Sequence, residues 1–130
     1  MSARIRTLTV DCRDWRPLVA FWAEAAGLAE DPDNPNSPDD DEGMLVTPAG
    51  MNVLFLPVPE AKTVKNRLHL DLAPTDRSRD EEVERLTALG ASLVADHRLD
   101  DGTGWVTLAD PEGNEFCVER SDAERDAAGS

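Results

Sequence analysis

The chain has 130 residues and a formal net charge of −14, because 27 acidic residues outnumber 13 basic ones. A chain of this length fits one compact domain, and a hydrophobic content of 40% is enough for a core. The acidic charge argues against nucleic acid as a partner, since phosphate backbones need clustered lysine and arginine. It favours the attraction of cationic ligands.

Cysteine usage and hydropathy predict the compartment. Cys12 and Cys117 form no disulfide framework, so we expect a reduced, cytoplasmic location. The N-terminus alternates polar and apolar residues and lacks the apolar run of a signal peptide. No segment approaches the roughly 20 apolar residues of a membrane span, so no membrane partner is expected.

A strand and a helix are the first elements that the pattern predicts. Polar and apolar residues alternate over 4–12, which predicts a strand with one polar face. The residues on that face are Thr7, Thr9 and Asp11. Asp14 is placed to cap the following helix, and Gly27 to end it in a left-handed conformation. The helix carries an apolar stripe and should cover the other face of the strand.

An acidic loop and two strands complete the first half. Residues 30–43 are acidic and rich in proline, so we expect an exposed loop, either simply solvated or acting as a lid over a site. Strand patterns follow at 44–46 and 51–57, separated by a turn. Residues 59–65 are typical of a linker.

The second half begins at residue 66. Its first strand, 66–72, places His69 and Asp71 on one face and three leucines on the other. Asp76 is expected to begin a helix that Gly90 ends. Three further strands are predicted, and after them a frayed tail. Their ranges are 92–99, 105–109 and 115–119, with the tail at 121–130.

These two halves repeat one another at a spacing of 62 or 63 residues. Thr7, Asp14, Gly27 and Gly50 correspond to His69, Asp76, Gly90 and Gly113. A repeat that returns once predicts a pseudo-twofold pair of βαβββ modules, at 4–58 and 66–120. We therefore expect an α+β fold in which a curled mixed sheet forms a cleft between the modules, with the function located in that cleft.

His69 and Asp71 form the candidate catalytic pair. They share a strand face at a separation of about 7 Å. A carboxylate near an imidazole can fix its tautomer and raise its basicity, which suits a general base. The alternative is a histidine that is hydrogen-bonded inside the sheet for packing.

Other side chains on the predicted cleft faces are candidates for ligand contact. They are Thr7, Thr9, Asp11, Trp105, Glu115 and Cys117. An acidic and polar floor suits a ligand with amine or hydroxyl groups, and the ring of Trp105 is placed to form a wall.

Three segments carry a resemblance to a known family: VDCRDWRPLVAFWAEAAGL, NRLHLDL and DPEGNEFCVE. Together with the doubled βαβββ order, they resemble the vicinal-oxygen-chelate superfamily, the group of glyoxalase I, the bleomycin-resistance proteins and the extradiol dioxygenases. The likeness is greatest to the small glyoxalase-like domains of that group and covers about residues 4–120. It implies eight strands curled around a ligand cleft, and often a homodimer.

The resemblance also implies where a divalent ion would bind in metal-dependent members. The corresponding positions are Thr7, Leu54, His69 and Cys117. His69 is a good ligand and Cys117 can bind Zn²⁺, but Thr7 is poor and Leu54 cannot ligate. Asp71 and Glu115 are expected on other rungs of the sheet. No metal cofactor is therefore predicted, and Leu54 is assigned to ligand contact; a bound ion would be held by His69 and Cys117.

Three functions follow from this resemblance and these residues. The first is a metal-independent enzyme of the lyase or isomerase type, in which His69 moves a proton. The second is a non-catalytic protein that sequesters a drug or metabolite, like the bleomycin-resistance proteins. The third is a metal-dependent lactoylglutathione lyase or dioxygenase.

Overall fold

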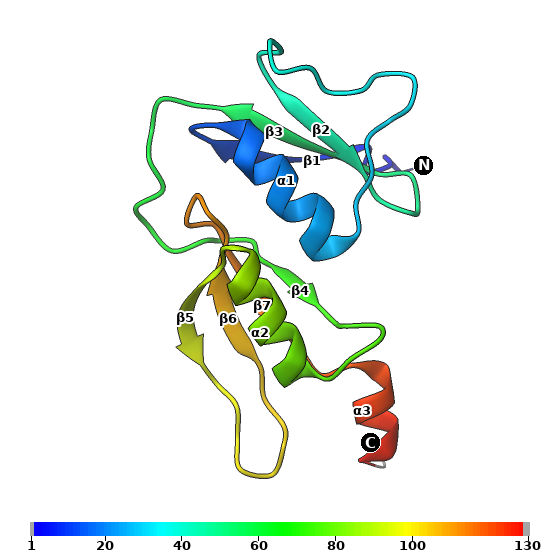
Figure 1. Cartoon of the computed structure of the whole chain (residues 1–130), viewed down its shortest axis with the longest axis vertical. Coiled ribbons are helices and arrows are strands. Elements are labelled where there is room, and N and C mark those ends of the chain that lie inside the picture. Colours follow the sequence, from blue (N-terminus) through cyan, green and yellow to red (C-terminus); the bar gives the residue numbers. More distant parts are fainter. Residues whose placement is uncertain (1, 129–130) are drawn as a thin grey trace. The chain divides into compact units, whose positions relative to one another are not determined.

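The computed structural model describes residues 2–128, which form seven strands and three helices (Figure 1). The chain divides into two compact units, Met1–Thr63 and Val64–Ser130, here called the first and second units. Both contain a mixed sheet and at least one helix, so the predicted α+β class is confirmed. None of the helices in the described part is long and apolar enough to cross a membrane.

The first unit holds a three-stranded sheet in the order β1-β3-β2. Its strands are β1 (Thr7–Cys12), β2 (Gly43–Val46) and β3 (Asn52–Pro57). Strand β1 runs parallel to β3, and β2 runs antiparallel to it. Where the predicted order requires a fourth strand, the structure has an isolated bridge between Ala29 and Val46. The proline-rich segment after Ala29 cannot supply the backbone donors of a longer strand.

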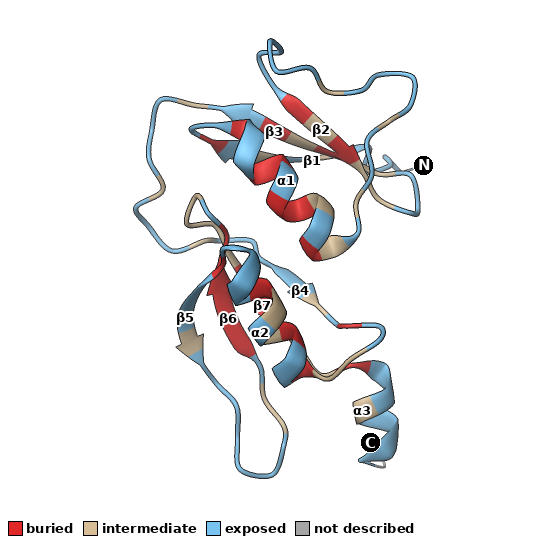
Figure 2. Ribbon diagram, in the orientation of Figure 1, coloured by how far each residue is buried: buried red, intermediate tan, exposed pale blue. Residues whose placement is uncertain are grey.

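Helix α1 (Trp15–Ala26) begins and ends as the sequence predicts. The Asp14 carboxylate accepts a hydrogen bond of 3.1 Å from the backbone N of Arg16, and Gly27 ends the helix at φ 63°. A left-handed φ of this kind is open to glycine at little cost. The buried stripe of α1 packs on β2 and β3 (Figure 2), whose buried residues include Phe55, Leu45 and Val53.

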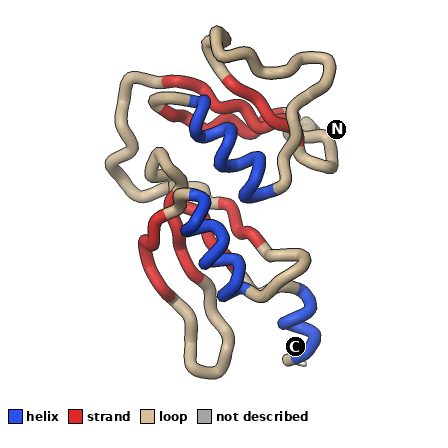
Figure 3. The backbone as a smooth tube through the Cα atoms, viewed as in Figure 1, coloured by secondary structure: helices blue, strands red, loops and turns tan. Residues whose placement is uncertain are grey.

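The acidic segment is a largely exposed loop, as predicted, although it ends at residue 42 because Gly43 is buried and begins β2, and the loop is tied to its own unit (Figure 3). The Trp15 indole donates to the carbonyl oxygen of Asp40 at 3.1 Å, and Arg16 Nε donates to that of Pro38 at 3.0 Å. Asn36 exchanges two hydrogen bonds of 2.9 Å with the backbone of Met44. These bonds hold the loop against α1 and the start of β2.

The second unit holds a four-stranded sheet in the order β4-β7-β6-β5. The strands are β4 (Leu70–Leu72), β5 (Ser92–Asp96), β6 (Val106–Ala109) and β7 (Glu115–Val118). Strand β4 runs parallel to β7, and the other pairs are antiparallel. The observed β4 is shorter than the predicted strand 66–72, so His69 lies just before it. Of the three leucines, Leu68 and Leu70 are 82% and 41% exposed, and Leu72 is half-buried.

Helix α2 (Arg79–Leu89) covers one face of this sheet, but the prediction that Asp76 begins it is wrong. Ser78 is the N-cap: its hydroxyl accepts from the backbone N of Glu81 at 3.1 Å, and the Glu81 carboxylate accepts from the backbone N of Ser78 at 2.9 Å. This reciprocal capping box satisfies two backbone donors. Asp76 instead pairs with Arg77.

The same motif explains a second error, at the C-terminus. Ser121 and Glu124 form a capping box at the start of α3 (Asp122–Ala127), where a frayed tail is predicted. The Glu124 carboxylate also accepts a hydrogen bond of 2.8 Å from the backbone N of Arg79. The short helix is thereby attached to the start of α2. The last two residues of the predicted tail lie outside the described residues.

Arg79 is a buried cation that joins α2 to the β5–β6 hairpin. Its side chain is 7% exposed, and Nη1 donates to three consecutive carbonyl oxygens. These are Gly102 at 3.1 Å, Thr103 at 3.0 Å and Gly104 at 3.2 Å. Nε pairs with Asp80 at 3.0 Å. A buried guanidinium with this many acceptors holds the loop in one position.

Replacing Arg79 with Met should therefore destabilise the protein. Loss of the donor leaves partly buried carbonyls unsatisfied, which costs about 1–3 kcal/mol of unfolding free energy. Arg67→Met is the matched control, because Arg67 is an exposed arginine of the same unit, and it should change the free energy by less than about 0.5 kcal/mol. Urea unfolding measures both, and equal midpoints for the two variants would contradict the role of Arg79.

Candidate functional site

Strand pairing in the second unit brings three polar side chains into one row. In the ladder, Asp71 of β4 lies opposite Cys117 of β7, and Cys117 lies opposite Thr107 of β6. Directly opposed residues project to the same face of a sheet. Phe116 and Val118, which alternate with Cys117, are buried on the other face. The row Asp71–Cys117–Thr107 thus belongs to the face that α2 does not cover.

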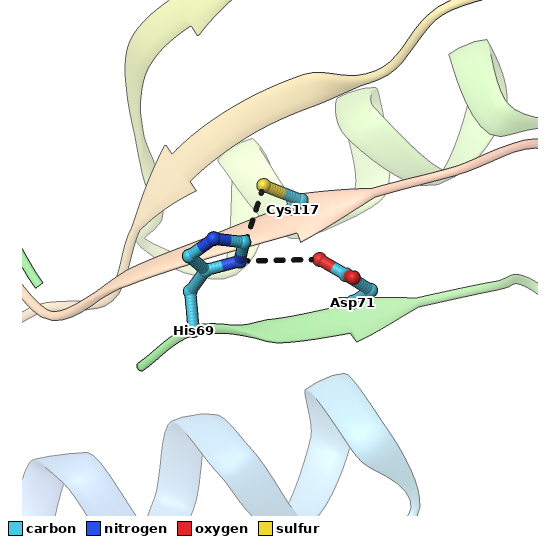
Figure 4. A group of neighbouring side chains, drawn as sticks. All are labelled: His69, Asp71 and Cys117. Atoms are coloured by element: carbon cyan, nitrogen blue, oxygen red, sulfur yellow. Dashed lines mark hydrogen bonds and ion pairs between the residues drawn. The ribbon is translucent and has the colours of Figure 1, made fainter. Parts of the chain in front are cut away.

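His69 joins this row from the segment just before β4. Its Nδ1 lies 3.3 Å from Asp71 Oδ1 and 3.9 Å from Cys117 Sγ (Figure 4). The side chains of His69 and Asp71 are 44% and 51% exposed. Both predicted catalytic residues are therefore in contact and accessible to a ligand, and their catalytic role stays a prediction.

Cys117 is buried beside this pair, and its thiol is held in the neutral form. Burial raises its pKa most, with the negative charge of Asp71 acting in the same direction. The Thr107 hydroxyl lies 3.5 Å from Sγ. A thiol with a raised pKa is a poor nucleophile at neutral pH. Thr107 was not singled out from the sequence, although its alternation with Trp105 places both on this face.

A pocket of about 940 Å³ opens on this face. Its volume is within the range of small-molecule sites, about 300–1,000 Å³. All of its lining residues belong to the second unit. They include the predicted residues His69, Asp71, Trp105, Glu115 and Cys117. They also include Glu119, which alternates with Glu115 and Cys117, and residues that the sequence did not identify: Lys65, His97, Leu99, Thr103, Thr107, Arg120 and Arg125.

Glu115 fixes the chain that leads to His69. Its Oε1 accepts from the backbone N of Asn66 at 3.1 Å, and its own backbone N donates to Asn66 Oδ1 at 3.2 Å. Its Oε2 pairs with Lys65 Nζ at 3.3 Å. Glu115 thus holds the segment before β4 against the start of β7, in addition to lining the pocket.

The Asp-Pro-Glu-Gly-Asn turn sets the register that positions Cys117. Asp110 is 2% exposed, and its Oδ1 accepts from the backbone N of Glu112 at 2.9 Å and of Asn114 at 3.0 Å. Gly113 adopts φ 90°, which glycine tolerates best. The turn joins β6 to β7, so it decides which residue of β7 faces Thr107.

Four predicted ligand-contact residues belong to the first unit. Thr7, Thr9 and Asp11 are exposed on β1, on the face opposite the one that α1 covers, and the half-buried Leu54 lies beside Thr9 in the ladder. Their predicted common face is therefore observed. The prediction that they share a cleft with the second module stays a prediction.

The set of side chains that could hold a divalent ion differs from the four positions that the resemblance implies. Leu54 has no donor atom, but His69, Asp71 and Cys117 offer nitrogen, oxygen and sulfur atoms that lie within 4.8 Å of one another. Placing Asp71 on another rung was wrong, because the parallel register sets it directly opposite Cys117. Such a donor set suits Zn²⁺, with a fourth position open. Asp71 thus joins His69 and Cys117 as a third possible ligand.

Comparison with known families identifies one match that spans most of the chain. Residues 7–119 match the family described as Glyoxalase-like domain. A comparison with curated proteins gives no match.

Solved structures share the fold at low sequence identity. A glyoxalase/bleomycin resistance protein/dioxygenase family enzyme from Burkholderia phytofirmans is 21% identical, with a TM-score of 0.68, over 89% of this chain and 97% of that one. The fosfomycin resistance protein FosX from Listeria monocytogenes is 18% identical over all of both chains, with a TM-score of 0.70. A mutant of FosX was solved with Mn(II) and dihydroxypropylphosphonic acid; it is 18% identical over 96% and 94% of the two chains, with a TM-score of 0.69.

The state of Cys117 can be tested by alkylation. Because its pKa is raised, the thiolate fraction at pH 8 is smaller than in a free thiol, and burial limits access. Iodoacetamide should label Cys117 at least ~10-fold more slowly than glutathione at that pH. Mass mapping of digested samples measures the rate, and protein unfolded in urea is the control that should label fast. Labelling of the folded protein at the glutathione rate would show a reactive thiolate instead.

Proposed function

The chain belongs to the glyoxalase-like domain family, and we propose that it binds a small organic molecule in the pocket of the second unit and acts on it as a metal-independent lyase or isomerase. The contact between His69 and Asp71 at the pocket wall carries this proposal. A cytoplasmic location and a homodimer remain predictions from the sequence.

His69 is the proposed proton acceptor. Its Nδ1 faces the Asp71 carboxylate, so Nε2 is the ring atom left to meet a ligand. In the tautomer with a proton on Nδ1, Nε2 carries the lone pair that takes a proton from the ligand. Asp71 holds that tautomer and stabilises the imidazolium that forms. Return of the proton to another atom gives an isomerase, and departure of a leaving group gives a lyase.

Cys117 has a packing role in this proposal. Its raised pKa keeps it neutral beside the histidine, so it neither competes as a nucleophile nor places a second negative charge next to Asp71. The arrangement leaves His69 as the basic group of the row.

A screen followed by matched variants tests the role of His69. Chelator-treated protein is screened by thermal shift against small organic molecules, and a stabilising compound is then followed by NMR for conversion. His69→Gln should bind that compound within about threefold of wild type but lose at least ~100-fold in kcat, because proton transfer contributes that much or more. Asp71→Asn should lose about 10–100-fold and shift the pH profile of kcat.

His97→Gln is the comparison variant, since His97 lines the same pocket and contacts Trp105 rather than a carboxylate. Its effect should fall on KM rather than kcat. Full turnover by His69→Gln would refute the proton-transfer role. A ligand bound one-to-one and recovered unchanged from wild type would replace the enzyme with a sequestering protein.

A metal-dependent enzyme is the second candidate, favoured by the three donor atoms of His69, Asp71 and Cys117. A bound divalent ion would supply Lewis-acid polarisation of a ligand oxygen. The raised pKa of Cys117 opposes it, because a thiolate is the form that ligates.

Calorimetric titration with Zn²⁺ and turnover in excess EDTA separate the two candidates. The metal-independent enzyme keeps its turnover in EDTA. The metal candidate requires one Zn²⁺ site that Cys117→Ser and Asp71→Asn each weaken about 10-fold or more, while Cys12→Ser, a buried cysteine of the other unit, leaves it unchanged. Turnover that EDTA abolishes and one equivalent of Zn²⁺ restores would overturn the first proposal.

A further inference from the structure

We infer that the pocket of the second unit selects planar organic anions, with Arg120 binding the anionic group and Trp105 the planar body. This inference rests on the proposed binding function and adds a ligand class to it. Two independent features of the pocket carry it: the pairing of its charges and the exposure of its aromatic wall.

Most of the charged side chains around the pocket neutralise one another. Lys65 pairs with Glu115 at 3.3 Å, and Arg125 pairs with Glu119 at 2.9 Å. These two pairs leave little net charge on their sides of the pocket, so a charged ligand would have to compete with an existing partner there. Asp71 contacts His69, which is neutral in its proposed role as a base, so this carboxylate keeps its negative charge and repels an anion on its own side of the pocket.

Arg120 differs from the other cations of the pocket. It is half-buried, and within residues 2–128 its side chain forms neither a hydrogen bond nor an ion pair. Its effect is felt only at longer range: the Thr103 hydroxyl, and more weakly the charge of Arg120, keep the pKa of Asp101 below its usual range. A half-buried guanidinium has lost part of its hydration and keeps its planar donors for a bidentate acceptor such as a carboxylate.

Trp105 and His97 form an exposed aromatic wall in the same pocket. Their rings lie 4.8 Å apart at an interplanar angle of 31°, and Trp105 is 45% exposed. Leu99, which also lines the pocket, is 60% exposed. Large apolar side chains that stay exposed around a pocket provide area for a ligand to cover, and an aromatic ring favours a planar partner.

The net charge of −14 favours a cationic ligand, whereas the groups that line the pocket favour an anionic one. The two arguments therefore predict ligands of opposite charge. At physiological ionic strength, charges more than about 8 Å away are largely screened, so groups lining the pocket dominate. The Arg120 cation is one of these groups and lacks a counter-ion within the described residues.

Four small probes separate charge from shape: benzoate, benzamide, benzylamine and cyclohexanecarboxylate. Calorimetry on the full chain should give benzoate an affinity at least ~10-fold above benzamide and benzylamine, as a charge-assisted hydrogen bond predicts. Benzoate should also exceed cyclohexanecarboxylate about threefold or more, because only a planar ring stacks on Trp105. These comparisons use wild-type protein and need no variant to fold.

Two variants then locate the contacts. Arg120→Gln should lower benzoate affinity ~10-fold or more and leave benzamide affinity within about twofold. Arg67→Gln removes the same charge outside the pocket and should leave both affinities within about twofold. Trp105→Leu should remove the preference of benzoate over cyclohexanecarboxylate. Thermal melts establish that each variant is folded.

The outcomes separate this inference from the proposed function. Tighter binding of benzylamine than benzoate, or an Arg120→Gln effect no larger than that of Arg67→Gln, overturns the ligand class and leaves the binding function standing. The same holds if the thermal-shift screen yields ligands while all four probes fail. If neither the probes nor the screen yields a ligand, the proposed function falls, and the ligand class falls with it.

Discussion

Parallel pairing of β4 with β7 is the constraint on which the site depends. It sets Asp71 directly opposite Cys117 and delivers the segment that carries His69 to the same face. A three-residue strand has few ladder bonds of its own, so its register needs support from outside. Asn66 and Glu115 provide that support at the start of the two strands, where the Asp110 turn also fixes the beginning of β7. A shift of one residue would turn Cys117 into the core and expose Phe116 in its place.

The sequence predicts the elements whose signals are local. Asp14 and Gly27 mark the ends of α1 by cap chemistry, and alternation alone places His69 and Asp71 on one face. The features that it could not predict depend on how one strand pairs with the next. Asp71 was separated from Cys117 because parity along one strand says nothing about register with the next. The Ser-x-x-Glu boxes at α2 and α3 can be recognised in the sequence. At α2, Asp76 lies two residues before Ser78 and also resembles a cap, and at α3 the small and charged composition suggests a frayed tail.

Residues other than the matched positions of the repeat complete the pocket. Arg120 and Arg125 follow the last strand, and His97 follows β5, and none of the three is among the positions that correspond between the halves. A duplicated sequence pattern predicts the strands and helices that both halves share. The parts that differ between the halves are the ones that give this pocket its charge and its aromatic wall, and no periodicity reports on them.

Arg79 holds the β5–β6 hairpin through main-chain oxygens, so the attachment does not depend on which side chains the hairpin carries at most of its positions. A carbonyl group is present whatever the side chain, so exchanging Thr103 leaves the anchor intact, whereas a Cβ at Gly104 would collide with the His97 carbonyl group. Thr103, within that anchored turn, and Leu99, beside it, both line the pocket of the second unit. Their side chains can therefore be exchanged at small cost to folding, which would change the surface of the pocket while the scaffold stays the same.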